Sequence, residues 1–233
     1  MPDYKSCYFA YIDLLGFKEI VKAKTCSEIV EIFNEAKKRY IINQITDENE
    51  EIPVIPSEEI HYYIMSDSIC IYIDDNVPYA FPILAWLCTF FQVRMLCLDT
   101  PVFVRGSITK GKIYSDSNVL FGPALVEAYL RAEKLARVPR IIIPVQLYDE
   151  TKDQTERAMR KGFTYLEQDG FYVTNYINYF CVHSSTVAYR EKVYQFVCNA
   201  LNTSLDQSIR EKYLYVKTLM DYYTQEEENS NEQ

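Results

Sequence analysis

The stretch Tyr11-Ile-Asp-Leu-Leu-Gly-Phe17 decides how this 233-residue chain is expected to fold. It ends an apolar run that begins at Cys7. Successive residues of a strand point to opposite faces, so a run in which both sets are apolar is typical of a central strand covered on both faces. Asp13 therefore stands where a buried strand ends. The chain then leads through Gly16 into a helical stretch.

The first 110 residues are predicted to run strand, helix, strand, strand, helix, strand. Two strand-like runs, 61–65 and 69–73, form a hairpin with Asp67 at its tip, and an apolar helix separates them from a strand at 101–110. This order matches the split βαβ, ferredoxin-like α+β plan, in which the third strand lies antiparallel beside the first. The topology therefore predicts that Asp67 meets Asp13 at one edge of the sheet.

The rest of the chain is expected to extend the same domain. A turn at Gly111 is followed by a helix that starts near Gly122, a strand at 140–143 and further helices, the last a long amphipathic helix over 186–223. We expect one domain over residues 1–223, made of a core at about 5–145 and an extension at about 146–223, with a disordered acidic tail over 224–233.

Composition excludes several classes of function. The net charge of −9 argues against a broad nucleic-acid interface, which needs clustered Lys and Arg. The longest apolar stretch, Tyr79 to Phe91, is too short to span a bilayer. The 7 cysteines are scattered without a Cys-x-x-Cys pair or a secretory signal, which points to a reducing cytoplasm. We expect a soluble cytoplasmic protein that neither inserts into membranes nor binds nucleic acid.

Paired carboxylates at a sheet edge are suited to cation binding. Asp13 and Asp67 would together hold two divalent cations, Mg²⁺ or Mn²⁺, with the carbonyl of Leu14 as a neutral oxygen ligand. Paired cations of this kind are how proteins handle triphosphates. The alternative is that each aspartate only ends a strand or shapes a turn, as Asp often does.

Chemistry on a triphosphate needs two further features. Backbone N–H groups at the turn formed by Gly16 and Phe17 would lie near the phosphates. A cation must also meet the charge that develops on phosphorus, and Arg131, on the helix after Gly122, is the first candidate. Arg105 is the second candidate. The alternatives are a solvated helix residue for Arg131, and an arginine paired with an acidic neighbour for Arg105.

Taken together, these residues resemble a class III nucleotidyl cyclase catalytic domain over roughly residues 5–145. The stretch Ile12-Asp13-Leu14-Leu15-Gly16-Phe17 resembles the family's first metal motif, and Ser66-Asp67 resembles its hairpin aspartate. The residues from Arg105-Gly106 through Gly111 resemble its glycine-containing strand. Gly122 with Glu127-x-x-x-Arg131 resembles its late helix. In the last motif Glu127 replaces the family's Asn. The resemblance implies a two-metal cyclisation by a head-to-tail homodimer with its sites at the interface.

The residues in these motifs are most similar to those of the bacterial pyrimidine cyclases of Pycsar antiphage systems. The motifs concerned are Tyr-x-Asp-Leu-Leu-Gly-Phe, Ser-Asp-Ser, Arg-Gly-x-Ile and Gly-Pro-Ala-Leu-Val-Glu-Ala-Tyr. This resemblance implies a cytosolic homodimer that makes cyclic UMP from UTP, or cyclic CMP from CTP. The product would act on a cyclic-nucleotide-responsive effector in antiviral defence.

Two departures from the family bear on specificity. Members that recognise ATP place a lysine a few residues before the second aspartate, where this chain has His61-Tyr62-Tyr63, and a bulky Tyr62 would narrow the base pocket toward a pyrimidine. The missing Asn leaves the positioning of the ribose to Tyr129 or Glu127. A purine cyclase and a catalytically inactive, nucleotide-binding dimerisation domain remain the alternatives.

Overall fold

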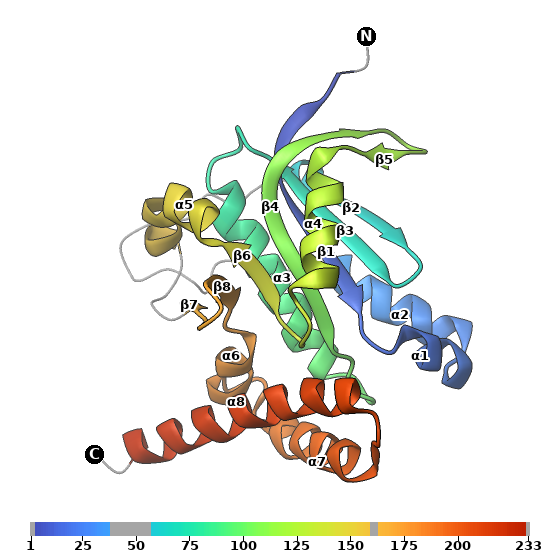
Figure 1. Cartoon of the computed structure of the whole chain (residues 1–233), viewed down its shortest axis with the longest axis vertical. Helices are drawn as coiled ribbons and strands as arrows, with labels where there is room; N and C mark the ends of the chain where they lie inside the picture. The colour runs from blue at the N-terminus through green and yellow to red at the C-terminus, as the bar shows by residue number, and fades with distance from the viewer. Residues whose placement is uncertain (1–2, 38–56, 159–162, 232–233) are drawn as a thin grey trace.

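A computed structural model describes residues 3–37, 57–158 and 163–231 of the chain (Figure 1). The strands are β1 (Lys5–Leu14), β2 (His61–Met65), β3 (Ser68–Asp74), β4 (Val104–Ser115), β5 (Leu120–Phe121), β6 (Ile141–Pro144), β7 (Thr164–Leu166) and β8 (Phe171–Thr174). The α-helices are α1 (Phe17–Ala23), α2 (Cys26–Lys37), α3 (Ala80–Leu96), α4 (Pro123–Lys134), α5 (Val145–Ala158), α6 (Tyr176–Val182), α7 (Val187–Thr203) and α8 (Gln207–Asn231). A short 3-10 helix covers Ser57–Glu59.

The predicted ferredoxin-like core is confirmed. Within the described residues the sheet has 8 strands in the order β2-β3-β1-β4-β6-β8-β7, with β5 paired to β4. The first four strands in this order are antiparallel to their neighbours, which is the arrangement predicted from the order of elements along the chain. β6 then joins β4 in parallel and carries the sheet into the C-terminal part of the chain.

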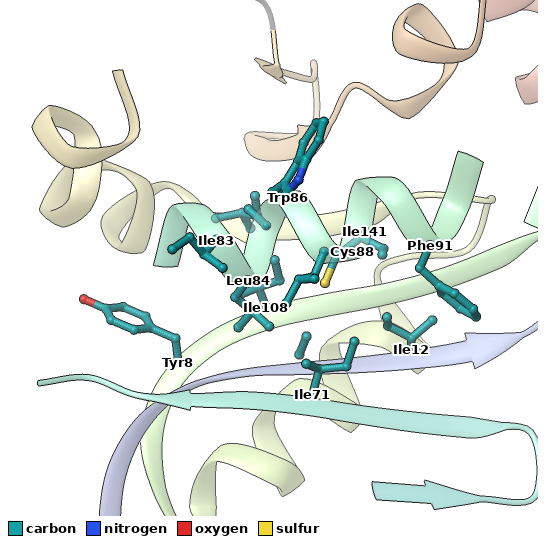
Figure 2. Close-up of a cluster of buried hydrophobic side chains, with 14 of the residues drawn as sticks. Tyr8, Ile12, Ile71, Ile83, Leu84, Trp86, Cys88, Phe91, Ile108 and Ile141 are labelled. Carbon is teal, nitrogen blue, oxygen red and sulfur yellow. The ribbon is translucent and has the colours of Figure 1, made fainter. Parts of the chain in front are cut away.

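The central strand β1 is covered on both faces, which explains its unbroken apolar run. Helix α3 packs on one face and α4 on the other, and alternate side chains of β1 point to each. The α3 face receives Tyr8, Ala10, Ile12 and Leu14, and the α4 face receives Cys7, Phe9 and Tyr11. Figure 2 shows Ile12 and Ile71 of the sheet packing beneath Leu84 and Cys88 of α3.

The turn predicted at Gly111 is wrong, because β4 continues through this residue to Ser115. Gly111 pairs with Cys7 of β1 in the ladder. A Cβ atom added to Gly111 would lie 3.1 Å from the Cβ of Ala124. The glycine therefore lets α4 approach the sheet closely, and does not mark the end of the strand.

The single long helix predicted over 186–223 is also wrong. The structure has two helices, α7 and α8, because the backbone adopts an extended conformation at Ser204 and the Asp206 side chain caps the next helix. Oδ1 of Asp206 accepts the N–H of Ile209 at 3.0 Å. Helix α8 then runs past Tyr223 to Asn231, into the acidic segment for which disorder was predicted. In the part of the chain that the structure describes, no helix has the length and apolar character needed to cross a membrane.

Candidate functional site

The structure brings Asp13 and Asp67 to the same edge of the sheet. Asp13 lies opposite Ser68 in the antiparallel ladder between β1 and β3. The N–H of Leu14 donates to the carbonyl oxygen of Asp67 at 2.9 Å, which ties the hairpin turn to the end of β1. The turn is tight, since Ser66 adopts a left-handed conformation with φ of 56°. The topology thus joins two carboxylates that are far apart in sequence.

The Asp13 carboxylate lies in a partly desolvated position. Its side chain is 16% exposed, and Nε of Arg105 donates to Oδ2 at 2.7 Å. Burial raises the pKa of the Asp13 carboxyl above its ordinary value, and the Asp67 carboxylate adds to this effect, although Arg105 opposes it. Because the net shift is upward, the cationic neighbours do not fully compensate the charge on Asp13. A further cation would stabilise this group.

The donor set fits hard divalent cations. Among the described residues, no group of three or more His, Cys, Asp and Glu side chains is placed to hold a metal ion. Two carboxylates and a backbone carbonyl such as that of Leu14 would therefore leave several ligand positions to water or phosphate oxygens. An all-oxygen, partly open shell of this kind suits Mg²⁺ or Mn²⁺ and does not suit structural zinc.

The turn after Asp13 is built around Gly16. Gly16 has a φ of 76°, and a Cβ atom added to it would meet nothing within 4 Å, so the space above the turn is open. The N–H groups of Leu14 and Leu15 are already donated to Asp67 and Phe103. The Phe17 ring packs on Phe33 with ring centres 5.8 Å apart, which anchors the start of α1.

Arg105 takes the alternative role considered for it, that of an arginine paired with an acidic neighbour. It lies directly opposite Asp13 in the β1–β4 ladder, and its side chain is 23% exposed. The ion pair closes one side of the aspartate pair. Arg105 is thus part of the site, as a direct partner of Asp13.

Within one chain, the structure holds Arg131 away from the aspartates. Its Nη1 donates to Oγ1 of Thr109 at 3.2 Å, and its Nη2 lies 2.5 Å from Oε1 of Glu127. Thr109 lies four residues from Arg105 along β4. At about 3.3 Å per residue, Thr109 is therefore about 13 Å from Arg105, the residue that pairs with Asp13. Glu127 and Arg131 therefore form an ion pair of their own on α4.

Tyr62 does not share the face of the aspartates. Its ring packs against the cluster beneath α3, whereas Asp13 faces α4. The neighbouring Tyr63 points to the α4 face, where it packs with Tyr72 and donates its hydroxyl to the carbonyl of Asp116. Tyr62 and Tyr63 differ because adjacent side chains of a strand point to opposite faces of the sheet.

Tyr129 of α4 packs on Tyr11, which lies on the same face of β1 as Asp13. Its ring meets that of Tyr11 edge to face, with centres 5.5 Å apart. A hydrogen bond to Glu133 raises the pKa of Tyr129, and the charge of Asp13 adds to the shift. The Tyr11 hydroxyl in turn shares a 2.6 Å hydrogen bond with Ser68.

Sequence reasoning missed Tyr11 and Ser68 as members of the site, although both carried a signal. Tyr11 precedes Asp13 by two residues, so the strand period places it on the same face. Ser68 follows Asp67 directly and is 8% exposed. Their hydrogen bond links β1 to the start of β3 beside the two carboxylates.

Comparison with solved structures identifies this fold. The chain is similar to the catalytic core of a rhodopsin-guanylyl cyclase with converted specificity, in complex with ATPαS, with a TM-score of 0.51, 12% identity, and coverage of 73% of this chain and 96% of that chain. The chain has the fold of a nucleotide cyclase catalytic core. No family model and no curated protein sequence matches it.

Two further structures of cyclase domains are similar at lower scores. The monomeric guanylyl cyclase domain of the RhoGC fusion protein from the aquatic fungus Blastocladiella emersonii has a TM-score of 0.47, 14% identity, and coverage of 74% of this chain and 95% of that chain. A bacterial light-regulated adenylyl cyclase has a TM-score of 0.44, 15% identity, and coverage of 75% and 92%.

Proposed function

We propose that this chain is a nucleotidyl cyclase that converts UTP, or less readily CTP, into its 3′,5′-cyclic nucleotide and pyrophosphate. The observation that carries the proposal is the meeting of Asp13 and Asp67 at the edge of a cyclase-type sheet. In the reaction the 3′-hydroxyl loses its proton to water as its oxygen forms a bond to the α-phosphorus. The bond from that phosphorus to the bridging oxygen breaks, and pyrophosphate leaves with the electron pair.

The two aspartates would hold the catalytic cations, with the Leu14 carbonyl as a further oxygen ligand. When bound, two Mg²⁺ or Mn²⁺ ions would make the attacking hydroxyl a better nucleophile and neutralise the charge of the triphosphate. The N–H groups of Gly16 and Phe17 would bind phosphate oxygens, since those of Leu14 and Leu15 are donated within the protein. Arg105 would keep Asp13 ionised and oriented.

A second copy of the chain would complete the site. Arg131 is held at Thr109 in its own chain, so it would stabilise charge on a nucleotide bound by the other protomer of a head-to-tail homodimer. Glu127 would orient it through their ion pair. The exposed side chains of α4, which include Val126, Tyr129 and Leu130, supply an apolar surface for this contact.

Pyrimidine specificity rests on the sequence resemblance and on aromatic side chains in place of the lysine of ATP-recognising members. Tyr63 and His61 lie on the α4 face of the hairpin, and His61 stacks on Tyr72 with ring centres 4.6 Å apart. We assign the narrowing of the base pocket to Tyr63 in place of Tyr62. Ribose positioning would fall to Tyr129, which packs on Tyr11 of the strand that carries Asp13, and the cyclic product would activate a separate effector in antiviral defence.

The deciding experiment supplies purified protein and Mn²⁺ with each of the four ribonucleoside triphosphates separately, and resolves the products by mass. A cyclic mononucleotide from UTP or CTP alone supports the proposal. A product from ATP or GTP keeps the cyclase chemistry and removes the pyrimidine assignment. If no triphosphate reacts while the metal still binds, the result favours a missing activator or an inactive nucleotide-binding domain.

Replacement of Asp13 or Asp67 by Ala should reduce turnover to below a few per cent of the wild-type rate. Each aspartate would supply a cation ligand, and among the described residues no third His, Cys, Asp or Glu side chain is placed to take over that role. The matched control is Asp153→Ala, which removes an exposed carboxylate from α5. Circular dichroism of all three variants should show a native fold. An aspartate variant that retains substantial activity would contradict the assignment.

A further inference from the structure

Arg140, just before β6, is a buried charged residue outside the aspartate site. It is 7% exposed, and its guanidinium forms ion pairs with Glu167 and Asp169 in the turn between β7 and β8. Nη2 of the same guanidinium also donates to the carbonyl oxygen of Leu135, at the end of α4, at 3.0 Å. One buried side chain therefore joins the β7–β8 hairpin to the helix that carries Arg131.

The contact with Leu135 secures the last turn of α4. The last carbonyl groups of a helix have no partner within it, and an arginine side chain can satisfy them. The N–H groups of Leu135 and Ala136 both donate to the carbonyl oxygen of Arg131, at 2.9 and 3.2 Å. Arg140 thus holds the turn of backbone that begins at Arg131, the residue proposed to meet the charge that develops on phosphorus.

The buried face of α4 consists of small side chains, which are Ala124, Ala128 and Ala132. Alanine lets the helix approach the sheet closely, as the contact of Ala124 with Gly111 requires. A row of methyl groups interdigitates less with the sheet than large side chains do, so it constrains sliding along the helix axis only weakly. The polar contact at Leu135 supplies a constraint along that axis, at the end of the helix where Arg131 lies.

The C-terminal extension fixes the carboxylate that pairs with Arg140. Tyr215 of α8 donates its hydroxyl to Oε1 of Glu167 at 2.7 Å, and Tyr165 of β7 donates to the same oxygen at 3.0 Å. The other oxygen of Glu167, Oε2, is the one that pairs with Arg140. A carboxylate with both oxygens bonded is held in one orientation, so α8 helps to determine where the guanidinium lies.

We propose that Arg140 is a positioning residue for Arg131: it fixes the C-terminal end of α4, and α8 in turn holds Arg140 through Glu167. This inference rests on the proposed function, which gives Arg131 its role. A catalytic group that is misplaced by about 1 Å can cost about 100-fold in rate, so the end of α4 needs a rigid support. The planar fork of an arginine donates to several acceptors at once, whereas a lysine at this position would keep the charge and lose part of the contacts.

The first test measures the end of α4 directly and needs no turnover. Amide hydrogen exchange of residues 131–136 is compared in the full wild-type chain, Arg140→Lys, Tyr215→Phe and Thr174→Val. We expect Arg140→Lys to speed exchange at Leu135 and Ala136 by roughly tenfold, and Tyr215→Phe to speed it by about threefold. Thr174→Val is the matched control, because it removes a buried hydrogen bond between β8 and Gln92 of α3 that does not involve Arg140.

Exchange at Leu135 and Ala136 that is no faster in Arg140→Lys than in Thr174→Val overturns the inference. If Arg140→Lys does not fold, as thermal melts would reveal, Tyr215→Phe takes its place in the comparison. Unchanged exchange in Tyr215→Phe then overturns the inference in the same way.

The second test measures catalysis and separates this inference from the proposed function. With UTP or CTP as substrate, Arg140→Lys should lower kcat by about tenfold and change KM by less than about twofold, because Arg131 acts in the transition state. Thr174→Val should leave kcat within about twofold of wild type.

A double-mutant cycle shows whether the loss passes through Arg131. In the Arg131→Ala background, Arg140→Lys should have little further effect on kcat, whereas a substitution that only destabilises the fold lowers kcat equally in both backgrounds. Fully additive losses overturn the inference and leave the cyclase proposal unaffected. If the wild type forms no cyclic nucleotide, the proposed function fails, and the exchange result decides by itself whether Arg140 positions Arg131.

Discussion

Arg105 provides the sharpest test of the aspartate site, because it compensates Asp13 directly. The pair is joined at 2.7 Å, and the side chains are only 23% and 16% exposed. Loss of one partner costs about 3–5 kcal/mol for a buried pair, whereas an exposed pair is worth about 0–1 kcal/mol. For this intermediate exposure, we expect Arg105→Ala to lower the free energy of unfolding by about 2 kcal/mol when EDTA is present.

A divalent cation should reverse that loss. A cation at Asp13 and Asp67 replaces the missing positive charge, and a ligand at about 100 times its Kd stabilises the folded state by about 2.7 kcal/mol. Arg105→Ala should therefore regain most of its stability in Mn²⁺. It should also bind Mn²⁺ more tightly than the wild type, because the arginine no longer competes for Oδ2 of Asp13.

Urea unfolding followed by fluorescence is a suitable assay. The only tryptophan, Trp86, is buried on α3 among Phe90, Phe163 and Tyr179, so its emission reports loss of the core. Unfolding is compared in EDTA and in Mn²⁺. Lys112→Ala, which removes an exposed charge from the same strand, should change stability by less than about 0.5 kcal/mol in both conditions.

Either of two results would contradict cation binding at Asp13. One is an equal loss of stability by Arg105→Ala in EDTA and in Mn²⁺. The other is a gain from Mn²⁺ in Asp13→Ala that matches the gain in the wild type. In both cases, the cation would bind somewhere other than at Asp13.

Two further predictions test the packing around the site. Gly106→Ala should destabilise the chain by on the order of 3 kcal/mol in urea unfolding, because the added Cβ would lie 2.4 Å from the carbonyl oxygen of Tyr11; a loss below about 1 kcal/mol would contradict this β1–β4 contact. Native labelling with iodoacetamide at pH 8 should modify exposed Cys26 and spare Cys7 and Cys70. Burial raises the pKa of both buried thiols to about 12, so they stay protonated at pH 8, and rapid labelling of either, read by peptide mass, would contradict their burial.

Local sequence patterns predicted the elements that surround the site. The unbroken apolar run before Asp13 indicated a strand covered on both faces, and the structure covers it with α3 and α4. The paired strand-like runs around Asp67 indicated a hairpin, and its place beside β1 followed from the order of elements. These features depend on neighbouring residues and on a small set of permitted topologies, so one sequence is sufficient to predict them.

Patterns of the same kind failed where a single residue or a distant contact decided the outcome. Gly111 signals a turn in isolation, but the approach of Ala124 makes it a strand residue. The amphipathic pattern over 186–223 continues smoothly through 204–206, and the cap provided by Asp206 breaks the helix there. Helical periodicity reports which face is apolar and carries little information on where a helix is interrupted.

The sequence by itself determined the ferredoxin-like order of strands and helices and the meeting of Asp13 with Asp67, because both follow from local pattern and permitted topology. Only the tertiary structure decided that Tyr63, and not Tyr62, lies on the α4 face of the sheet, and that Arg131 is held at Thr109. These placements depend on strand phase and on packing between elements that are far apart in the sequence, which no local pattern encodes.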